Sequence, residues 1–475
     1  MCRLKHVGSR LSILARAISD EIPGIGITQI LGLTLFASHH QKMVLVDYQR
    51  PEISIGHVMG HNMHRNYWDT NAHLYDDAAA KRSPGFGPWQ DLSTRVKGPV
   101  LYDLNHNFCK AWDREAGWFH SRKNTELWSE RKSIEPDTFM QPVGTVAQIC
   151  RTQPQEDKET SIHDLYIKAL GTCRNYVYFE NQYFRYPDFG KQLKELAAIL
   201  KARGREQDLY LFVVTNNPND SGVARNTYAA LKELGQEQLM PQAQRSLAYD
   251  VRNARSELAA LQGTLPDDTP MARSRYEQRT AALKNIIANG EEQGINAEVE
   301  GRLGELKRDD IPELAKKTAS ENSDAKPYEL KDLPGLKVVI GTLTTCNPGI
   351  GSELLKGDKA VYREVYVHSK LMVVDDAFSL LSSANLNHRS MHTDSELGIA
   401  VPNHELARKW RDELWTMHAG VSANDSRGLC NATENFNKWN EVMDENWENK
   451  NKDLPLIRSL TRFWDVVSAY AIALD

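Results

Sequence analysis

Cysteine is scarce in this sequence of 475 residues, and no two cysteines are spaced as a Cys-x-x-Cys pair. Neither a zinc site built on paired cysteines nor a disulfide scaffold is therefore indicated, and reduced thiols in a cytoplasm are expected. Long hydrophobic runs are missing too, and none approaches the roughly 20 apolar residues that span a bilayer. The longest candidate, residues 27–37, contains three polar side chains and is interpreted as a buried segment. No Gly-x-Ser-x-Gly elbow occurs, which disfavours a serine lipase.

An excess of basic charge is also missing. Lys and Arg number 58 against 63 Asp and Glu, which gives a net charge of −5. A dedicated nucleic-acid-binding protein normally carries a basic footprint, so no nucleic-acid partner is expected. The N-terminus is basic but lacks a clear apolar block followed by a small-residue cleavage site. We therefore expect synthesis in the cytoplasm without a secretory signal peptide, and any export would use a different system.

What the sequence does contain is an alternation of short apolar runs with amphipathic stretches, which predicts an α/β protein. Hydrophobic residues make up 41% and charged residues 25%, as in ordinary globular chains. The predicted strands are residues 43–46, 53–58, 176–179, 209–215, 337–343, 361–374 and 379–381. The predicted helices are residues 101–112, 162–170 and 189–201, and an amphipathic tail at 454–474.

The composition changes between about residues 232 and 324, where Ala, Glu, Gln, Lys, Arg and Leu dominate and aromatic residues almost vanish. We interpret this stretch as one or two long helix pairs inserted into the domain. A solvated helical arm is the simpler reading, and partner binding or substrate gating is the alternative. The expected division is a first half at 1–150, the start of a second half at 151–231, a helical insertion at 232–326 and the remainder of the second half at 327–475.

The pattern His-x-Lys-x-x-x-x-Asp occurs twice. The two copies consist of His40, Lys42 and Asp47, and of His368, Lys370 and Asp375. Each copy is followed by a second strand-like run that ends in an asparagine, Asn62 in the first copy and Asn385 in the second. Two such matches are improbable by chance, so the repeat is a strong signal of shared chemistry.

The spacing has a physical reason. In a β-strand, residues i and i+2 point to the same face, so each histidine projects together with the lysine of its copy. The neighbouring strand delivers the asparagine beside them. Two such units that face each other would bring two imidazoles, two ammonium groups and two amides to one small anionic site. Asp47 and Asp375 lie at strand ends, five residues after their lysines, and are expected to be structural anchors more than catalysts.

This set of groups suits phosphoryl transfer without a metal or another cofactor. The lysines and asparagines can hold the non-bridging oxygens of a phosphodiester. One histidine can attack phosphorus, while the other protonates the leaving alcohol and then activates water as a base. A nucleophilic histidine needs a carboxylate on its other ring nitrogen, and Glu396 and Asp69 are the candidates for this orienting role. Glu180 fits a cleft lining and a buried hydrogen-bond network equally well. The remaining histidines lack a metal-binding pattern, so no metal site is expected.

The repeat and its flanks resemble the phospholipase D superfamily. The similar flanks are residues 39–42, 88–91, 95–99, 179–184, 366–370 and 383–390 (HHQK, PWQD, RVKGP, FENQYF, YVHSK and SANLNHRS). They are more similar to true phospholipase D enzymes than to the small endonucleases or cardiolipin synthases. Residues 58–63 and 67–70 (VMGHNM and YWDT) are similar to bacterial phospholipase D effectors of type VI secretion.

The resemblance implies a fold of two pseudo-twofold related α/β units, each a mixed sheet flanked by helices, which share one site. It implies that His40 is the nucleophile and His368 the general acid. The implied substrate is a glycerophospholipid at a membrane surface, whose distal phosphodiester is hydrolysed through a phosphohistidine. The resemblance also implies an antibacterial effector that a type VI system delivers into the target-cell periplasm, with an immunity protein and a secretion-apparatus protein as partners.

The first motif of the family usually follows a long segment that builds the first sheet, whereas 39 residues precede His40 here. The first half is therefore expected to be incomplete at its N-terminus. Two alternative functions remain open from the sequence. One is a nuclease or other phosphodiesterase that uses the same site, and the other is an inactive remnant that acts through its helical insertion.

Overall fold

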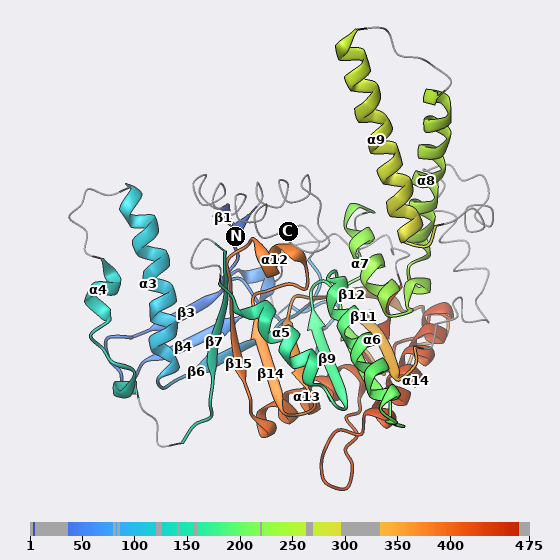
Figure 1. Ribbon diagram of the computed structural model, residues 1–475. Coiled ribbons are helices and arrows are strands. Elements are labelled where there is room, and N and C mark those ends of the chain that lie inside the picture. The colour runs from blue at the N-terminus through green and yellow to red at the C-terminus, as the bar shows by residue number, and fades with distance from the viewer. Residues whose placement is uncertain are drawn as a thin grey trace. The chain divides into compact units, whose positions relative to one another are not determined.

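Strands and helices alternate along the chain, which confirms the predicted α/β class (Figure 1). The computed structural model describes residues 3–4, 37–78, 82, 86–119, 126–139, 143–154, 159–218, 221–262, 269–295 and 333–464. The chain divides into two units. The first comprises Met1–Phe184, Glu195–Asn216 and Pro334–Arg462, and the second comprises Arg185–Lys194, Asn217–Leu333 and Phe463–Asp475.

A mixed sheet forms the centre of the first unit and has 11 strands within the described residues, in the order β5-β12-β11-β10-β9-β13-β14-β15-β7-β8, with β16 paired to β11. β9, β10 and β11 are mutually parallel, as the predicted βαβ rhythm requires, whereas β13, β14 and β15 are antiparallel. These strands are β5 (Trp89–Gln90), β7 (Gln148–Gln153), β8 (Glu159–Thr160), β9 (Tyr176–Asn181), β10 (Leu209–Val214), β11 (Leu336–Asn347), β12 (Val361–Val367), β13 (Lys370–Val374), β14 (Phe378–Ser382), β15 (Glu396–Val401) and β16 (Leu460–Arg462).

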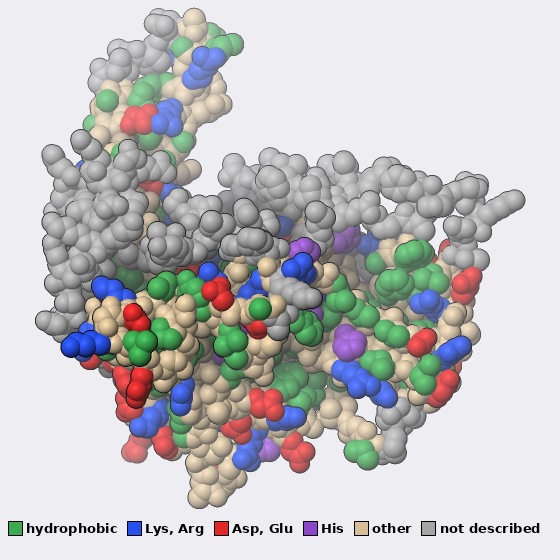
Figure 2. Space-filling model, turned by 180° about the vertical axis from the view of Figure 1, so that it is seen from behind, with side chains coloured by type: hydrophobic (Ala, Val, Ile, Leu, Met, Phe, Trp, Pro, Cys, Tyr) green, Lys and Arg blue, Asp and Glu red, His purple; other side chains and the backbone are tan. Residues whose placement is uncertain are grey.

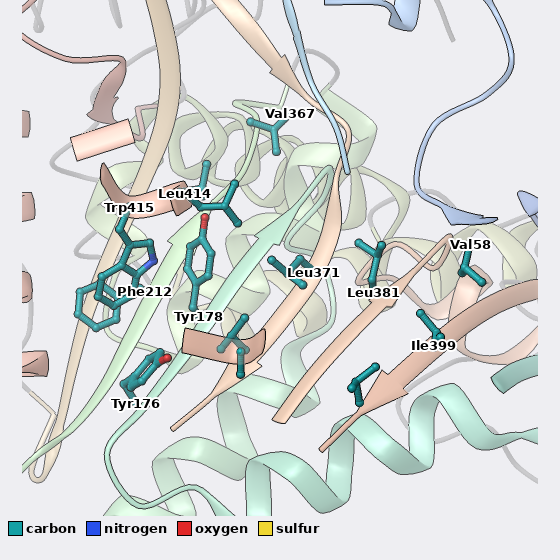
Figure 3. Packing of buried hydrophobic residues seen from close by; sticks show 14 of the residues in the cluster. Val58, Tyr176, Tyr178, Phe212, Val367, Leu371, Leu381, Ile399, Leu414 and Trp415 are labelled. Atoms are coloured by element: carbon teal, nitrogen blue, oxygen red, sulfur yellow. The ribbon is translucent and has the colours of Figure 1, made fainter. Parts of the chain in front are cut away.

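A smaller antiparallel sheet of the same unit has the order β3-β4-β6 within the described residues. Its strands are β3 (Met43–Val46), β4 (Ile55–Met59) and β6 (Ser93–Val96), and a separate pair joins β1 (Arg3–Leu4) to β2 (Ser38–His39). Val58 of β4 belongs to the same hydrophobic cluster as Leu381 and Ile399 of the large sheet, so the two sheets share one core (Figure 3).

Helices alternate with these strands along the chain. They are α3 (Val100–Phe119), α4 (Leu127–Arg131), α5 (Ser161–Thr172), α6 (Pro187–Ala202), α7 (Ser221–Glu233), α8 (Pro241–Gln262), α9 (Pro270–Glu292), α12 (His388–His392), α13 (His404–Ala419) and α14 (Ala432–Asn451), with short 3-10 turns at Arg65–Tyr67, Pro136–Phe139 and Glu237–Leu239. Among the described helices, none combines the length and apolar character needed to cross a bilayer.

Helices cover both faces of the large sheet, so all six positions of β9 are buried. The ring of Tyr178 lies 5.6 Å from Trp415 of α13, whereas the next residue, Phe179, lies 6.1 Å from Tyr166 of α5 on the other face. Phe212 of β10 lies 4.4 Å from Trp415, and these rings form the centre of the core (Figure 3). The alternation of side chains along β9 therefore places the two helices on opposite faces.

The stretch predicted to be a helical arm belongs to the second unit, where α8 and α9 form a hairpin (Figure 1). A Cβ at Gly290 would lie 2.1 Å from Val251, so the glycine lets α9 approach α8 closely. Arg279 and Glu257 form an exposed ion pair across the hairpin. Residues 263–268 and 296–326 of the predicted insertion lie outside the described residues.

The predicted helix at residues 454–474 is wrong in its first part. Leu460–Arg462 instead form β16, in which Leu460 pairs with Leu343 and Arg462 pairs with Gly341. A short apolar run fits a strand as well as a helix. Here the backbone groups of β11 at Gly341–Leu343 pair with residues 460–462, and this pairing favours the strand. Residues 465–475 lie outside the described residues, as do residues 27–36 of the segment expected to be buried, whose last residue, Ala37, is buried.

The face drawn in Figure 2 carries described side chains of both charge signs, as the nearly balanced composition leads one to expect. On this face, the basic and acidic side chains of the described residues are interspersed.

Candidate active site

The two motif copies occupy equivalent positions in their sheets. Met43, the residue after the first motif lysine, pairs with Val58 across β3 and β4. Leu371, the residue after the second motif lysine, pairs with Leu381 across β13 and β14. The two ladders therefore have the same register, although the connecting loops differ in length.

The equivalence extends to the third strand of each copy. The backbone N–H of Gly60 donates to the carbonyl of Leu92 over 3.0 Å, and that of Ser383 donates to the carbonyl of Leu397 over 2.8 Å. In each copy the residue before this carbonyl is an acid. These acids are Asp91 in the first copy and Glu396 in the second.

His40 is paired with the acid of the other copy. Its Nδ1 lies 2.9 Å from Oε1 of Glu396, and its backbone N–H donates to the carbonyl of Ser395 over 2.9 Å. The hydroxyl of Ser383 donates a further hydrogen bond to Glu396. Burial alone would raise the pKa of Glu396, but the charge and hydrogen bond of His40 hold it below its usual value. Glu396 thus lies at Nδ1 of His40, the position from which a carboxylate can orient the imidazole.

His368 is held by the reciprocal contacts. Its Nδ1 lies 2.7 Å from Oδ2 of Asp91, and its backbone N–H donates to the carbonyl of Gln90 over 2.8 Å. Burial lowers the pKa of His368 well below its usual value, and the charges of Lys370 and Lys42 lower it further. Burial also raises the pKa of Asp91 to about 6, against the opposing charge of Lys370.

Asp69 does not contact His368, so its prediction as the second orienting residue is wrong. Its carboxylate accepts hydrogen bonds from the backbone N–H of Trp89 over 2.8 Å and from Arg82 over 2.9 Å, and it lies 3.3 Å from His73. Asp69 follows Asn62 closely in sequence, but the chain carries it into the loop that leads to β5. The strand register, which brings Asp91 to the histidine, could have identified the correct acid.

Both motif lysines lie beside the histidines of their copies, as predicted. Nζ of Lys42 donates to the carbonyl of His40 over 2.8 Å, and Nζ of Lys370 donates to the carbonyl of His368. Lys370 also donates to Oε1 of Gln182 over 3.2 Å. Lysines from both copies and the His40 imidazole affect the pKa of His368, which indicates that the two copies surround one common region.

The predicted substrate-binding asparagines follow the second strand of each copy. Asn62 is half-buried and donates from Nδ2 to the Tyr67 hydroxyl over 2.9 Å. Asn385 is 6% exposed, and its Oδ1 is buried and makes no hydrogen bond with any described residue. An unsatisfied buried amide oxygen is costly and is often satisfied by a ligand or water.

Asp47 and Asp375 lie away from the histidines, at the far ends of β3 and β13. The Asp375 carboxylate accepts hydrogen bonds from the backbone N–H groups of Asn175 and Tyr176, each over 2.8 Å, at the start of β9. Asp47 is exposed in the turn after β3. The contacts of Asp375 support its interpretation as a structural anchor, and the position of both residues at the far strand ends argues against a catalytic role for either.

Glu180 lies at the centre of a buried network beneath His368. It accepts hydrogen bonds from Nε2 of Gln90 over 2.7 Å and from the hydroxyl of Ser369 over 2.6 Å. His418 lies 2.9 Å from the other carboxylate oxygen. Burial would raise the pKa of Glu180, but His418 and these hydrogen bonds lower it to about 2. Glu180 therefore belongs to a buried hydrogen-bond network. This network holds Ser369, which follows His368 in the chain, and Gln90, whose carbonyl accepts from the His368 backbone.

Three aromatic rings that were not predicted as site residues surround His368. The ring centroids of Tyr67, Trp89 and Tyr366 lie 5.0, 5.6 and 6.3 Å from that of His368. Their apolar faces exclude water from the imidazole, which explains the effect of burial on its pKa. Trp89 and Tyr366 lie in flanks that carry the family resemblance, so the signal was present in the sequence.

Metal ligands do not converge in this region. Within the described part of the chain, no group of three or more His, Cys, Asp or Glu side chains is placed so that it could hold a metal ion.

Comparison with known proteins yields sequence matches across most of the chain. Residues 350–418 match the family described as "Cardiolipin synthase, PLD-like domain". Phospholipase D alpha 1 of Zea mays is 22% identical over 487 residues, which cover 88% of this chain and 53% of that protein. Phospholipase D alpha 2 of Arabidopsis thaliana is 24% identical over 494 residues, which cover 90% of this chain and 54% of that protein. The chain thus spans about half the length of the curated relatives it matches.

Among solved structures, phosphatidylserine synthase of Haemophilus influenzae Rd KW20 overlays with a TM-score of 0.30 at 11% identity, over 78% of this chain and 59% of that chain. This overlap is low, so the family relation depends on the sequence matches and on the repeat. The duplicated motif, its reciprocal histidine–carboxylate pairs and the sequence matches together support membership of this chain in the phospholipase D superfamily of phosphodiesterases.

Proposed function

We propose that this protein hydrolyses the distal phosphodiester of glycerophospholipids through a phosphohistidine intermediate. The observation that carries the proposal is the reciprocal pairing of His40 with Glu396 and of His368 with Asp91. A carboxylate on Nδ1 selects the tautomer whose Nε2 carries the lone pair, and it stabilises the imidazolium that forms later. Two histidines prepared in this way, with two lysines beside them, suit a displacement at an anionic phosphorus.

In the first step, Nε2 of His40 attacks phosphorus. The bond between nitrogen and phosphorus forms, the bond between phosphorus and the head-group oxygen breaks, and a proton passes from His368 to the leaving oxygen. His368 must be protonated for this role, although its surroundings lower its pKa. A bound phosphodiester offsets the lysine charges that contribute to this lowering, so substrate binding favours protonation.

In the second step, His368, now neutral, removes a proton from water. The water oxygen bonds to phosphorus, the bond to His40 breaks, and phosphatidic acid leaves. A short alcohol in place of water would give the corresponding phosphatidyl alcohol.

The proposal is tested by measuring choline and ethanolamine release from phospholipid vesicles in the presence of a chelator, with and without a short alcohol. We expect release that the chelator leaves unchanged, a phosphatidyl alcohol as a second product, and loss of both with His40→Ala or His368→Ala. Activity that disappears in chelator, or that survives either substitution, would contradict the mechanism. Digestion of DNA with no release from vesicles would favour the nuclease alternative instead.

The role as an antibacterial effector extends this proposal. It rests on the similarity of residues 58–63 and 67–70 to type VI effectors. Expression in a bacterial periplasm should then be toxic, expression in the cytoplasm should not be, and His40→Ala should abolish the toxicity. Equal growth with the wild type and this variant in the periplasm would refute the effector role without affecting the enzymatic proposal.

A further inference from the structure

The segment from His61 to Thr70, called here the site loop, exposes two large apolar side chains. Met63 is 78% exposed and Trp68 is 68% exposed. They stand just before and just after the 3-10 turn Arg65–Tyr67. Single exposed apolar residues are common on protein surfaces, so their meaning depends on how the loop is held and what lies beside it.

The site loop is fixed from within. Asn66 is buried, the ring centroid of Tyr67 lies 4.3 Å from that of Trp89, and Asp69 accepts a hydrogen bond from the Trp89 backbone. The backbone N–H groups of Tyr67 and Trp68 each donate to carbonyls of the turn over 3.1 Å. The loop therefore presents Met63 and Trp68 to solvent in a defined conformation.

The inner side of the site loop belongs to the candidate active site. Asn62 donates to the Tyr67 hydroxyl over 2.9 Å, and the Tyr67 ring lies 5.0 Å from that of His368. The outward-facing Met63 and Trp68 are thus direct sequence neighbours of residues at the site. A surface that binds Met63 and Trp68 would therefore lie next to Asn62 and His368 of the candidate active site.

The charges of the site loop indicate what that surface is. His64 and Arg65 are exposed between the two apolar side chains, and the one acidic residue, Asp69, is held by Arg82 and His73 with a side-chain exposure of 3%. Tryptophan favours the boundary between lipid head groups and acyl chains, and arginine pairs well with phosphate. An exposed Trp and Met flanking an exposed Arg match the surface of a phospholipid bilayer.

We propose that the site loop docks the protein on a phospholipid bilayer, with Met63 and Trp68 inserted at the interface and Arg65 at the lipid phosphates. This inference rests on the proposed function, because it places the bilayer where that function needs its substrate. It assigns the docking to side chains that take no part in the chemistry.

The test compares vesicles with a dispersed substrate. The Met63→Ala/Trp68→Ala double variant should lose at least about tenfold in kcat/KM on phosphatidylcholine vesicles. It should retain wild-type kcat/KM on dihexanoyl phosphatidylcholine below its critical micelle concentration. Trp112→Ala is the matched control, because Trp112 is 55% exposed on α3, and it should change neither rate. A double variant with unchanged vesicle activity would refute the docking role.

Co-sedimentation with vesicles gives a readout that does not depend on activity. Wild-type protein should pellet with phosphatidylcholine vesicles and the double variant should not. Arg65→Gln should weaken binding about fivefold when phosphatidylglycerol is added to the vesicles. If the wild type hydrolyses neither the vesicles nor the dispersed lipid, the proposed function is contradicted. Co-sedimentation then still tests whether the site loop binds the bilayer. If the wild type and the double variant pellet equally, or neither pellets, the docking fails whatever the activity.

Discussion

Nδ1 of His368 lies 2.7 Å from Oδ2 of Asp91, an acid that comes from the other copy of the repeated motif. The same relationship, reversed, joins His40 to Glu396. Each copy therefore provides the histidine of one pair and the carboxylate of the other. Neither pair can form unless both copies are folded against each other, so the catalytic arrangement depends on the duplicated fold as a whole.

Asp91→Asn should lower kcat by roughly 10²- to 10⁴-fold, because an amide cannot stabilise the protonated imidazole of His368. Asp69→Asn, which removes the acid first expected in this role, should reduce kcat by much less. Vesicle hydrolysis by both variants, with circular dichroism to confirm folding, makes the comparison. Equal losses from two folded variants would contradict the assignment of Asp91.

The pH dependence follows from the same pair. Burial raises the pKa of Asp91 to about 6, so the pair formed by Asp91 and His368 gains a proton as the pH falls through 6 and loses it above that value. In the proposed mechanism His368 delivers a proton to the leaving group, so kcat/KM should fall as the pH rises above about 6. Measured profiles should show this decline in the wild type, and in Asp91→Asn the decline should begin at a lower pH, because His368 loses its anionic partner. A rate that increases from pH 6 to pH 8 would contradict the assigned roles.

Gly60 is the position at which the two copies must differ. Its counterpart Ser383 donates a hydrogen bond to Glu396, whereas a Cβ at Gly60 would lie 2.4 Å from Oδ1 of Asp91. Gly60→Ala should therefore displace Asp91 and lower kcat by about 10²-fold. Gly144→Ala, at a glycine with open space around its Cβ position, is the control and should have no effect on kcat. Full activity of Gly60→Ala would show that the acid tolerates displacement.

Glu180→Gln should destabilise the protein by about 3–5 kcal/mol, because it removes the charge that holds His418, Gln90 and Ser369 in a buried network. The pKa of Glu180 is lowered to about 2 in the folded state, so its stabilising contribution is present above its usual pKa and disappears as the pH falls towards 2. Urea unfolding at neutral pH measures the effect. Glu413→Gln serves as the control, since Glu413 is exposed and its ion pair with Lys409 spans 3.8 Å. A loss no larger than that of the control would rule out this role for the network.

Much of the site could be predicted from the sequence because the chemistry is encoded locally. A histidine and a lysine two residues apart share one face of a strand, so His40 with Lys42 and His368 with Lys370 follow from spacing alone. The α/β class follows from the alternation of apolar runs and amphipathic stretches. Glu396 could be selected because it stands close after the second motif and starts a strand.

Asp91 could not be chosen by distance along the chain. Asp91 lies 22 positions after Asp69, further from the first motif along the chain. Only the β4–β6 register brings Asp91 back to the site, beside His368. The strand β16 was missed for a related reason. Its three residues are extended because β11 offers them backbone partners, and no local pattern encodes that pairing.

In the proposed mechanism, His40 attacks phosphorus and His368 transfers the protons. An ester with p-nitrophenol as its leaving group needs no general acid, so His368→Ala should still react once with phosphatidyl-p-nitrophenol but should not hydrolyse the product efficiently. We expect His368→Ala to give a burst of p-nitrophenolate equal to the enzyme concentration, with the phosphatidyl adduct on the peptide that contains His40. Steady turnover without a burst, or an adduct on any other residue, would contradict this mechanism.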